Sequence, residues 1–169
     1  PCGGPEPEML DLWKKAAPCL DFIAPDIYSF DFEKIAELYN REDNLFFVPE
    51  TRRDKWAPAN LYNAIGKYQA YGYSPFGAES IGENNSFITQ IDHTDSSDKN
   101  VSSEKILDYL AESYKLIGNM IPVLTKYYGT DDMTGFTQHQ GEMTRIICLG
   151  EYRIRLYFYH RIDDDEEYI

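Results

Sequence analysis

Cysteine, histidine and basic residues are scarce in this 169-residue chain, and each shortage excludes a class of protein. The three cysteines, Cys2, Cys19 and Cys148, and the three histidines lack the spacing of metal ligands, so we predict no metal site and no cofactor. Lys and Arg number 16 against 29 Asp and Glu, and the formal net charge is -13. This charge repels phosphate backbones and argues against a nucleic-acid partner. Cys19 precedes an apolar segment and is expected to be a small buried hydrophobe.

Long apolar runs are also lacking, so we expect no membrane partner. No signal peptide is recognisable, and the chain starts without Met at Pro1–Pro5, a turn-rich sequence typical of an interior loop. We therefore expect the chain to be part of a larger protein.

The clearest positive signal is the run Leu45-Phe46-Phe47-Val48, which ends in Pro49-Glu50-Thr51. Four consecutive bulky apolar residues predict a strand buried on both faces, as in a parallel sheet, with Glu50 at its C-terminal tip. On this segment alone, a solvated loop residue is an equally good interpretation of Glu50. Residues 20–28 and 72–79 predict two more strands, and all three segments carry a proline near the end, where sheet pairing stops. The residues placed at strand ends, where α/β folds carry their chemistry, are Asp26, Tyr28, Glu50, Phe76 and Glu79.

Helical patterns alternate with these strands. Residues 8–17, 32–39 and 58–71 each bring apolar side chains onto one face, and the first range includes Trp13, which is expected in the core. This alternation predicts parallel strands joined by right-handed crossovers.

The strongest helical pattern spans residues 103–128 and follows a polar loop, 86–100. Pro122 is expected to kink or interrupt this helix. A complete eight-stranded barrel takes ~250 residues. Three strand and helix units therefore predict the last third of a barrel.

The composition changes after residue 128. Residues 149–152 predict a hairpin turn, and the acidic run 163–167 is interpreted as a solvated loop. A lone hairpin is marginally stable, so this β module is expected to be incomplete. We therefore predict a barrel portion over 1–128 and the start of a C-terminal β-rich domain over 129–169. Its two or three antiparallel strands are expected over 133–137, 143–149 and 152–162.

Several motifs, in this order, resemble a known family. They are Asp21-Phe22-Ile23-Ala24-Pro25-Asp26-Ile27-Tyr28, Leu45-Phe46-Phe47-Val48-Pro49-Glu50-Thr51-Arg52-Arg53-Asp54 and Gly72-Tyr73-Ser74-Pro75-Phe76-Gly77. Residues 1–128 resemble the C-terminal part of the catalytic barrel of β-galactosidase-like glycoside hydrolases, and are most similar to bacterial family 35-type enzymes of the retaining TIM-barrel clan. The resemblance implies that the strands are the sixth, seventh and eighth of a (β/α)8 barrel.

The resemblance further implies a retaining, exo-acting β-galactosidase that hydrolyses carbohydrate by double displacement and uses no cofactor. Glu50 matches the nucleophile of the clan, whereas the acid/base belongs to an Asn-Glu pair that occurs nowhere in this chain. Tyr28 is expected to donate a hydrogen bond that keeps Glu50 ionised, and Arg52 or Arg53 to lower its proton affinity. Predicted substrate-binding residues are Tyr28, Asp26, Arg52, Trp56, Phe76 and Glu79.

A second hypothesis from a different class is a non-catalytic carbohydrate-binding or assembly module that keeps the barrel outline. The sequence upstream of Pro1 would separate the two hypotheses, because only the enzyme needs the Asn-Glu pair. The expected partners are a carbohydrate, the rest of the catalytic barrel and, through an open sheet edge, further copies of the chain in a homo-oligomer. Secretion to the periplasm or the exterior of a bacterium would suit a polymer-degrading enzyme.

Overall fold

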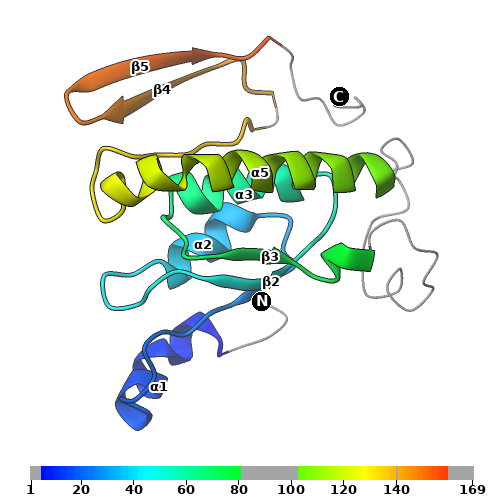
Figure 1. The fold of residues 1–169 in the computed structure, drawn as a ribbon. Coiled ribbons are helices and arrows are strands. Elements are labelled where there is room, and N and C mark those ends of the chain that lie inside the picture. The colour runs from blue at the N-terminus through cyan, green and yellow to red at the C-terminus, as the bar shows by residue number, and fades with distance from the viewer. Residues whose placement is uncertain (1–4, 81–102, 140, 160–169) are drawn as a thin grey trace.

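The computed structural model describes residues 5–80, 103–139 and 141–159. Within these ranges the fold is mixed α/β, with a three-stranded sheet among helices and then a two-stranded hairpin (Figure 1). The predicted polar loop 86–100 and the acidic run 163–167 lie outside the described residues.

The sheet contains β1 (Asp26–Ile27), β2 (Val48–Thr51) and β3 (Tyr73–Pro75), in the order β1-β2-β3. Both pairings are parallel, so the predicted strands and their direction are confirmed. Each strand is shorter than predicted, and the register shifts between Val48 and Thr51. Pro49 lies within that shift, consistent with the confinement of proline to edges and bulges of sheets. The sheet does not close into a barrel within the described residues.

All four predicted helices are present, although the third, predicted over 58–71, already ends at Gly66. The Asp31 side chain caps the second, because its Oδ1 accepts a hydrogen bond from Lys34 N at 3.2 Å. The fourth continues through Pro122, so the predicted interruption does not occur. The helical elements are η1 (Pro7–Met9), α1 (Leu10–Ala16), α2 (Phe32–Tyr39), α3 (Ala57–Gly66), η2 (Ala78–Ser80) and α5 (Ser103–Tyr127).

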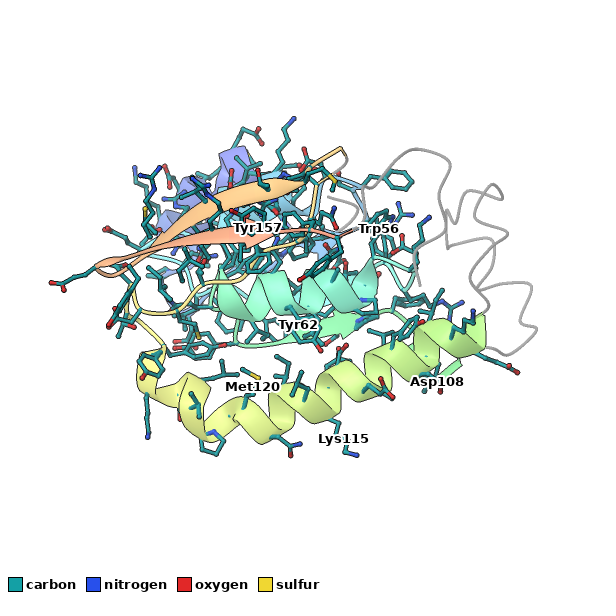
Figure 2. All side chains as sticks on the ribbon, turned by 90° about the horizontal axis from the view of Figure 1, so that it is seen from above. Trp56, Tyr62, Asp108, Lys115, Met120 and Tyr157 are labelled. Atoms are coloured by element: carbon teal, nitrogen blue, oxygen red, sulfur yellow. The ribbon has the colours of Figure 1, made fainter. Side chains whose placement is uncertain are left out.

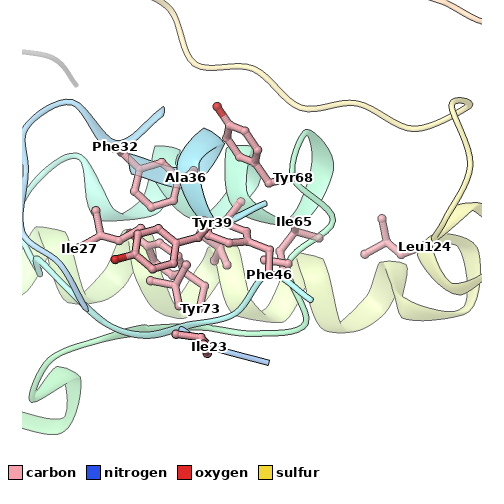
Figure 3. Close-up of a cluster of buried hydrophobic side chains, with 14 of the residues drawn as sticks. Ile23, Ile27, Phe32, Ala36, Tyr39, Phe46, Ile65, Tyr68, Tyr73 and Leu124 are labelled. Atoms are coloured by element: carbon pink, nitrogen blue, oxygen red, sulfur yellow. The ribbon is translucent and has the colours of Figure 1, made fainter. Parts of the chain in front are cut away.

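One apolar core joins alternate strand residues to the helices (Figure 3). Ile27, Val48 and Tyr73 point to this side of the sheet, which we call the helix-covered face. The predicted core positions of α3 and the residues after it are buried as expected. The whole cluster comprises Leu10, Ile23, Ile27, Phe32, Ala36, Tyr39, Phe46, Val48, Leu61, Ala64, Ile65, Tyr68, Ala70, Tyr73 and Leu124.

The opposite side, which we call the open face, carries Asp26, Glu50 and Ser74, all at least partly exposed. Phe22 lies on the same side, with its ring centroid 5.8 Å from that of Phe47. Leu45 remains 47% exposed. The prediction that this strand is buried on both faces is therefore wrong in the described chain, because no second layer covers the open face.

A buried amide bonds the chain before β1 to the loop after α2. Asn44 Oδ1 accepts a hydrogen bond from Ile23 N at 2.9 Å, and its Nδ2 donates to the carbonyls of Ile23 and Tyr39, each at 2.9 Å. The side chain thus satisfies the backbone of Ile23, which would otherwise need a neighbouring strand.

Two predictions about single residues are wrong. Trp13 is 45% exposed, because Leu10 is the only residue through which α1 reaches the core. Cys19 is exposed, because it lies in a turn after α1 and not in a strand.

The C-terminal hairpin pairs β4 (Thr144–Leu149) with β5 (Tyr152–Tyr157) in antiparallel register and lies above α3 and α5 in Figure 1. Its two-residue loop begins with Gly150 at φ 55°, so the predicted turn at 149–152 is confirmed. Residues 133–137 are not a strand. They pass close to α3 instead, where a Cβ on Gly66 would lie 2.7 Å from Gly135 Cα.

Candidate active site

Two carboxylates lie side by side at the C-terminal ends of the parallel strands. Asp26 of β1 and Glu50 of β2 are direct partners in the sheet register, and both belong to the open face. Burial and the negative charge of Glu50 raise the pKa of Asp26. The two groups therefore interact, and the interaction favours the protonated form of Asp26.

Tyr28 orients the Glu50 carboxylate. Its Oη donates a hydrogen bond to Glu50 Oε1 at 2.6 Å, from the position just after β1. A short bond of this kind restricts the rotamer of the carboxylate. The predicted contact between these two residues is confirmed, whereas their roles in a reaction remain a prediction.

Arg52 contacts the loops that surround the carboxylate pair. Its Nε donates to Asp54 Oδ2 at 2.5 Å, and its Nη1 donates to the carbonyl of Tyr28 at 3.4 Å. The guanidinium carbon also lies 3.7 Å from the centre of the Phe30 ring. Arg52 thus forms an ion pair with Asp54. The neighbouring Arg53 is buried and donates to the carbonyl of Gly77 at 3.1 Å.

Two predicted site residues follow β3. Phe76 lies at the site, and Glu79 lies further along the chain. Phe76 follows β3 directly, and its N donates to the carbonyl of Thr51 at 2.9 Å, which places it beside the end of β2. Glu79 lies in η2 and is exposed. Phe76 is therefore adjacent to the strand of Glu50, whereas Glu79 is a solvated residue one short turn later.

Trp56 belongs to different surroundings. It lies at the start of α3 (Figure 2), where its N donates to Asp54 Oδ1 at 2.9 Å. Its side chain lines a cavity of about 520 Å³ together with Phe30, Glu33 and His139. The lining of this cavity includes Trp56 but not Asp26, Tyr28 or Glu50.

Sequence reasoning missed a polar cluster around Glu33 of α2. Its carboxylate accepts hydrogen bonds from Lys67 Nζ at 2.7 Å and Asn63 Nδ2 at 2.9 Å, and lies 3.2 Å from His139 Nε2. Burial opposes ionisation of Glu33, but the hydrogen bonds from Lys67, His139 and Asn63 outweigh it and lower the pKa to about 2. The cluster joins α2, α3 and the segment before the hairpin. A partner 106 residues away leaves no local signal in the sequence, although Glu33 and Glu37 on one helix face could have indicated a polar contact.

The described residues offer no group of three or more His, Cys, Asp or Glu side chains that could hold a metal ion. No helix among them is long and apolar enough to span a membrane.

The comparison with known families matches residues 110–168 to a domain of unknown function, DUF5597. The matched range begins within α5 and includes the hairpin. No curated protein matches the chain.

Proposed function

We propose that this chain is the C-terminal part of the catalytic barrel of a retaining glycoside hydrolase, specifically a β-galactosidase, with Glu50 as the nucleophile. The observation that carries the proposal is the position of Glu50. It lies near the C-terminal end of the middle strand of a parallel sheet, on the open face, with a hydrogen bond from Tyr28 at 2.6 Å. Barrel enzymes place their catalytic groups at this end of the strands.

The proposed chemistry is a double displacement at the anomeric carbon of the sugar. Glu50 attacks the anomeric carbon of the sugar, and the bond from that carbon to the leaving oxygen breaks. The leaving oxygen takes a proton from a second carboxyl group about 5–5.5 Å from the first. We assign that group to a part of the protein that precedes this chain. Water then releases the sugar from Glu50 with net retention of configuration.

Asp26 and Phe76 complete the proposed sugar-binding surface on this side. Asp26 is partly exposed beside Glu50, so its oxygens are available to hydroxyl groups of a substrate. Phe76 presents an apolar ring at the next strand end. Arg52 acts as a positioning residue, because it is bonded to the carbonyl of Tyr28 and to Asp54.

The open face supports the view that further strands complete the sheet. Phe22 and Leu45 are 40% and 47% exposed on it, and β1 and β3 each leave one edge unpaired in the described chain. Apolar side chains and free edges of this kind are normally covered. We propose the remaining barrel strands as their partner, in a protein secreted to the periplasm or exterior of a bacterium.

The test is Glu50→Ala in the full-length parent protein. Turnover of an aryl β-galactoside should fall by several orders of magnitude, because the glycosyl-enzyme cannot form, while the circular dichroism spectrum is unchanged. Azide or formate should restore part of the activity and give a product of opposite anomeric configuration. Glu42→Ala is the matched control, since this exposed carboxylate lies in the turn between α2 and β2.

Turnover within tenfold of the parent, a difference below about 1.4 kcal/mol, would exclude Glu50 as the nucleophile. The chain would then fit better the second proposal, a carbohydrate-binding or assembly module without catalysis. Robust hydrolysis by the isolated 169-residue chain would contradict the assignment of the acid/base to another segment.

A further inference from the structure

The cavity that contains Trp56 lies between α2, α3 and the segment before the hairpin. It is about 520 Å³ in volume, within the range of roughly 300–1,000 Å³ that small-molecule sites occupy. Its walls come from the first turns of α2 and α3 and from residues 137–139. Ligand sites occur preferentially at such junctions between structural units.

Two aromatic rings form one side of this cavity. Phe30 is 71% exposed, but its ring is fixed by the Arg52 guanidinium at 3.7 Å. Trp56 is half-buried at the start of α3, and the Lys55 ammonium lies 5.4 Å from the centre of its ring. Aromatic rings bury apolar surface at little cost in conformational entropy, and the C–H-rich face of a pyranose ring presents such a surface.

Polar groups line the other side. The Glu33 carboxylate accepts hydrogen bonds from Lys67, Asn63 and, at 3.3 Å, from the Thr137 hydroxyl, so these groups are held together as one wall. Asn60 adds an amide that both donates and accepts. A sugar hydroxyl also donates and accepts at once, so this amide matches a polyhydroxyl ligand.

The charges around the cavity are of both signs. The lining holds Asp31, Glu33, Glu37 and Lys34. Three further cations lie on lining residues: Lys67 on Glu33, Lys55 over Trp56 and Arg52 over Phe30. Charges so closely balanced favour a neutral ligand over a charged one. A neutral ligand with hydroxyl groups and an apolar face fits both sides of the cavity.

We propose that this cavity is a second carbohydrate subsite, distinct from the Glu50 and Asp26 pair, in which a neutral sugar residue stacks on Phe30 and Trp56 and hydrogen-bonds to Asn60. The inference rests on the proposed function for the class of ligand, and on this cavity alone for the site. Because residues 137–139 form one wall, bound sugar would also contact the segment that leads to the hairpin.

The 169-residue chain itself is the appropriate sample. All the residues of the subsite are in it, whereas we expect no hydrolysis without the acid/base, so binding is measured apart from catalysis. The chain holds two tryptophans, and Trp13→Phe leaves Trp56 as the only one. Galactose, lactose and cellobiose would be titrated separately to 50 mM, roughly 50 times the dissociation constant of a 1 mM site. The two readouts are Trp56 fluorescence and calorimetry.

We expect a saturable change with at least one of these sugars, and at least a fivefold loss of affinity in both Phe30→Ala and Asn60→Ala. Phe30 is exposed, so its removal should leave the fold intact, as thermal unfolding would verify. Tyr152→Ala, on the exposed hairpin, is the matched control and should bind as the parent does.

The subsite would be excluded if none of the three sugars gave a saturable change. It would also be excluded if both cavity variants, Phe30→Ala and Asn60→Ala, bound sugar with the affinity of the parent. Saturation by spermidine at lower concentrations than any sugar would overturn it too, and would show an amine site instead. None of these results bears on Glu50, whose test uses turnover by the full-length protein.

Discussion

The two faces of the three-stranded sheet differ in what they contribute to the protein. On the helix-covered face, Ile27, Val48 and Tyr73 are buried against α2, α3 and α5. On the open face, Asp26 and Glu50 are partly exposed. Adjacent residues of one strand thus serve opposite purposes. We infer that stability and chemistry can be altered separately by substitutions one position apart.

The largest expected effect compares two leucines. Leu61→Ala in the isolated chain should lower the free energy of unfolding by about 2–5 kcal/mol, because it leaves a cavity in the core. Leu45→Ala, on the open face, should cost about 0.5 kcal/mol or less. Urea unfolding measures both. In the full-length parent, a completed barrel would bury Leu45, and its cost should rise to about that of Leu61. An unchanged small cost there would contradict a second layer.

The next effect concerns the open face alone. Tyr28→Phe in the full-length parent removes the hydrogen bond of 2.6 Å to Glu50. A bond to a charged group contributes about 1.5–3 kcal/mol, so kcat/KM should fall by roughly 10- to 150-fold while the urea midpoint stays within error. Tyr62→Phe, on α3, is the control. Equal losses of activity in the two variants would mean that Tyr28 does not act through Glu50.

The interaction between α3 and the segment before the hairpin gives a third effect. Gly66→Ala should destabilise the isolated chain by about 1–3 kcal/mol, because the new Cβ would lie 2.7 Å from Gly135 Cα. Gly118→Ala, within α5 and with no heavy atom within 4 Å of its Cβ, should instead stabilise it by about 0.5–1 kcal/mol. Thermal unfolding distinguishes the two signs, and stabilisation by Gly66→Ala would show that the segment does not lie against α3.

The smallest effect depends on pH. The pKa of Glu33 is lowered from 4.5 to about 2 on folding, so its contribution to stability is complete above pH 4.5 and is lost as the pH falls toward 2. Glu33→Gln should therefore destabilise the chain at pH 7 by about 1–2 kcal/mol, allowing for solvent screening, and by less at each lower pH. Urea midpoints from pH 2 to 7 measure this. Glu37→Gln, at an exposed carboxylate, should show little change, and a pH-independent Glu33→Gln effect would exclude the linkage.

Much of the fold could be predicted because its signals are local. The apolar run before Glu50, the prolines near the strand ends and the apolar faces of α3 and α5 correctly indicated parallel strands alternating with helices. The same signals do not show which face is covered. Trp13 and Leu45 are large apolar residues of the kind found in protein cores. In the described chain, however, no other element covers either of them.

The candidate site could be predicted only in part for a related reason. Tyr28 and Glu50 were found because strand ends converge at one edge of a parallel sheet. The Glu33 cluster and the cavity beside it depend on residues 137–139 folding back over α2, more than 100 residues later in the chain. The composition of residues 133–137 also indicated a strand. This segment instead lies against α3, where Gly135 approaches Gly66 closely, and it has no pairing strand in the described chain.

The Asn44 amide has a consequence for amide hydrogen exchange. Ile23 lies outside every helix and strand, and such residues usually exchange their amide protons quickly. Its N–H, however, is buried and bonded to Asn44 Oδ1. Its exchange in heavy water should therefore be as slow as that of the sheet, and opening of this one amide requires the loop after α2 to detach. A residue without secondary structure thus belongs to the most protected unit of the fold.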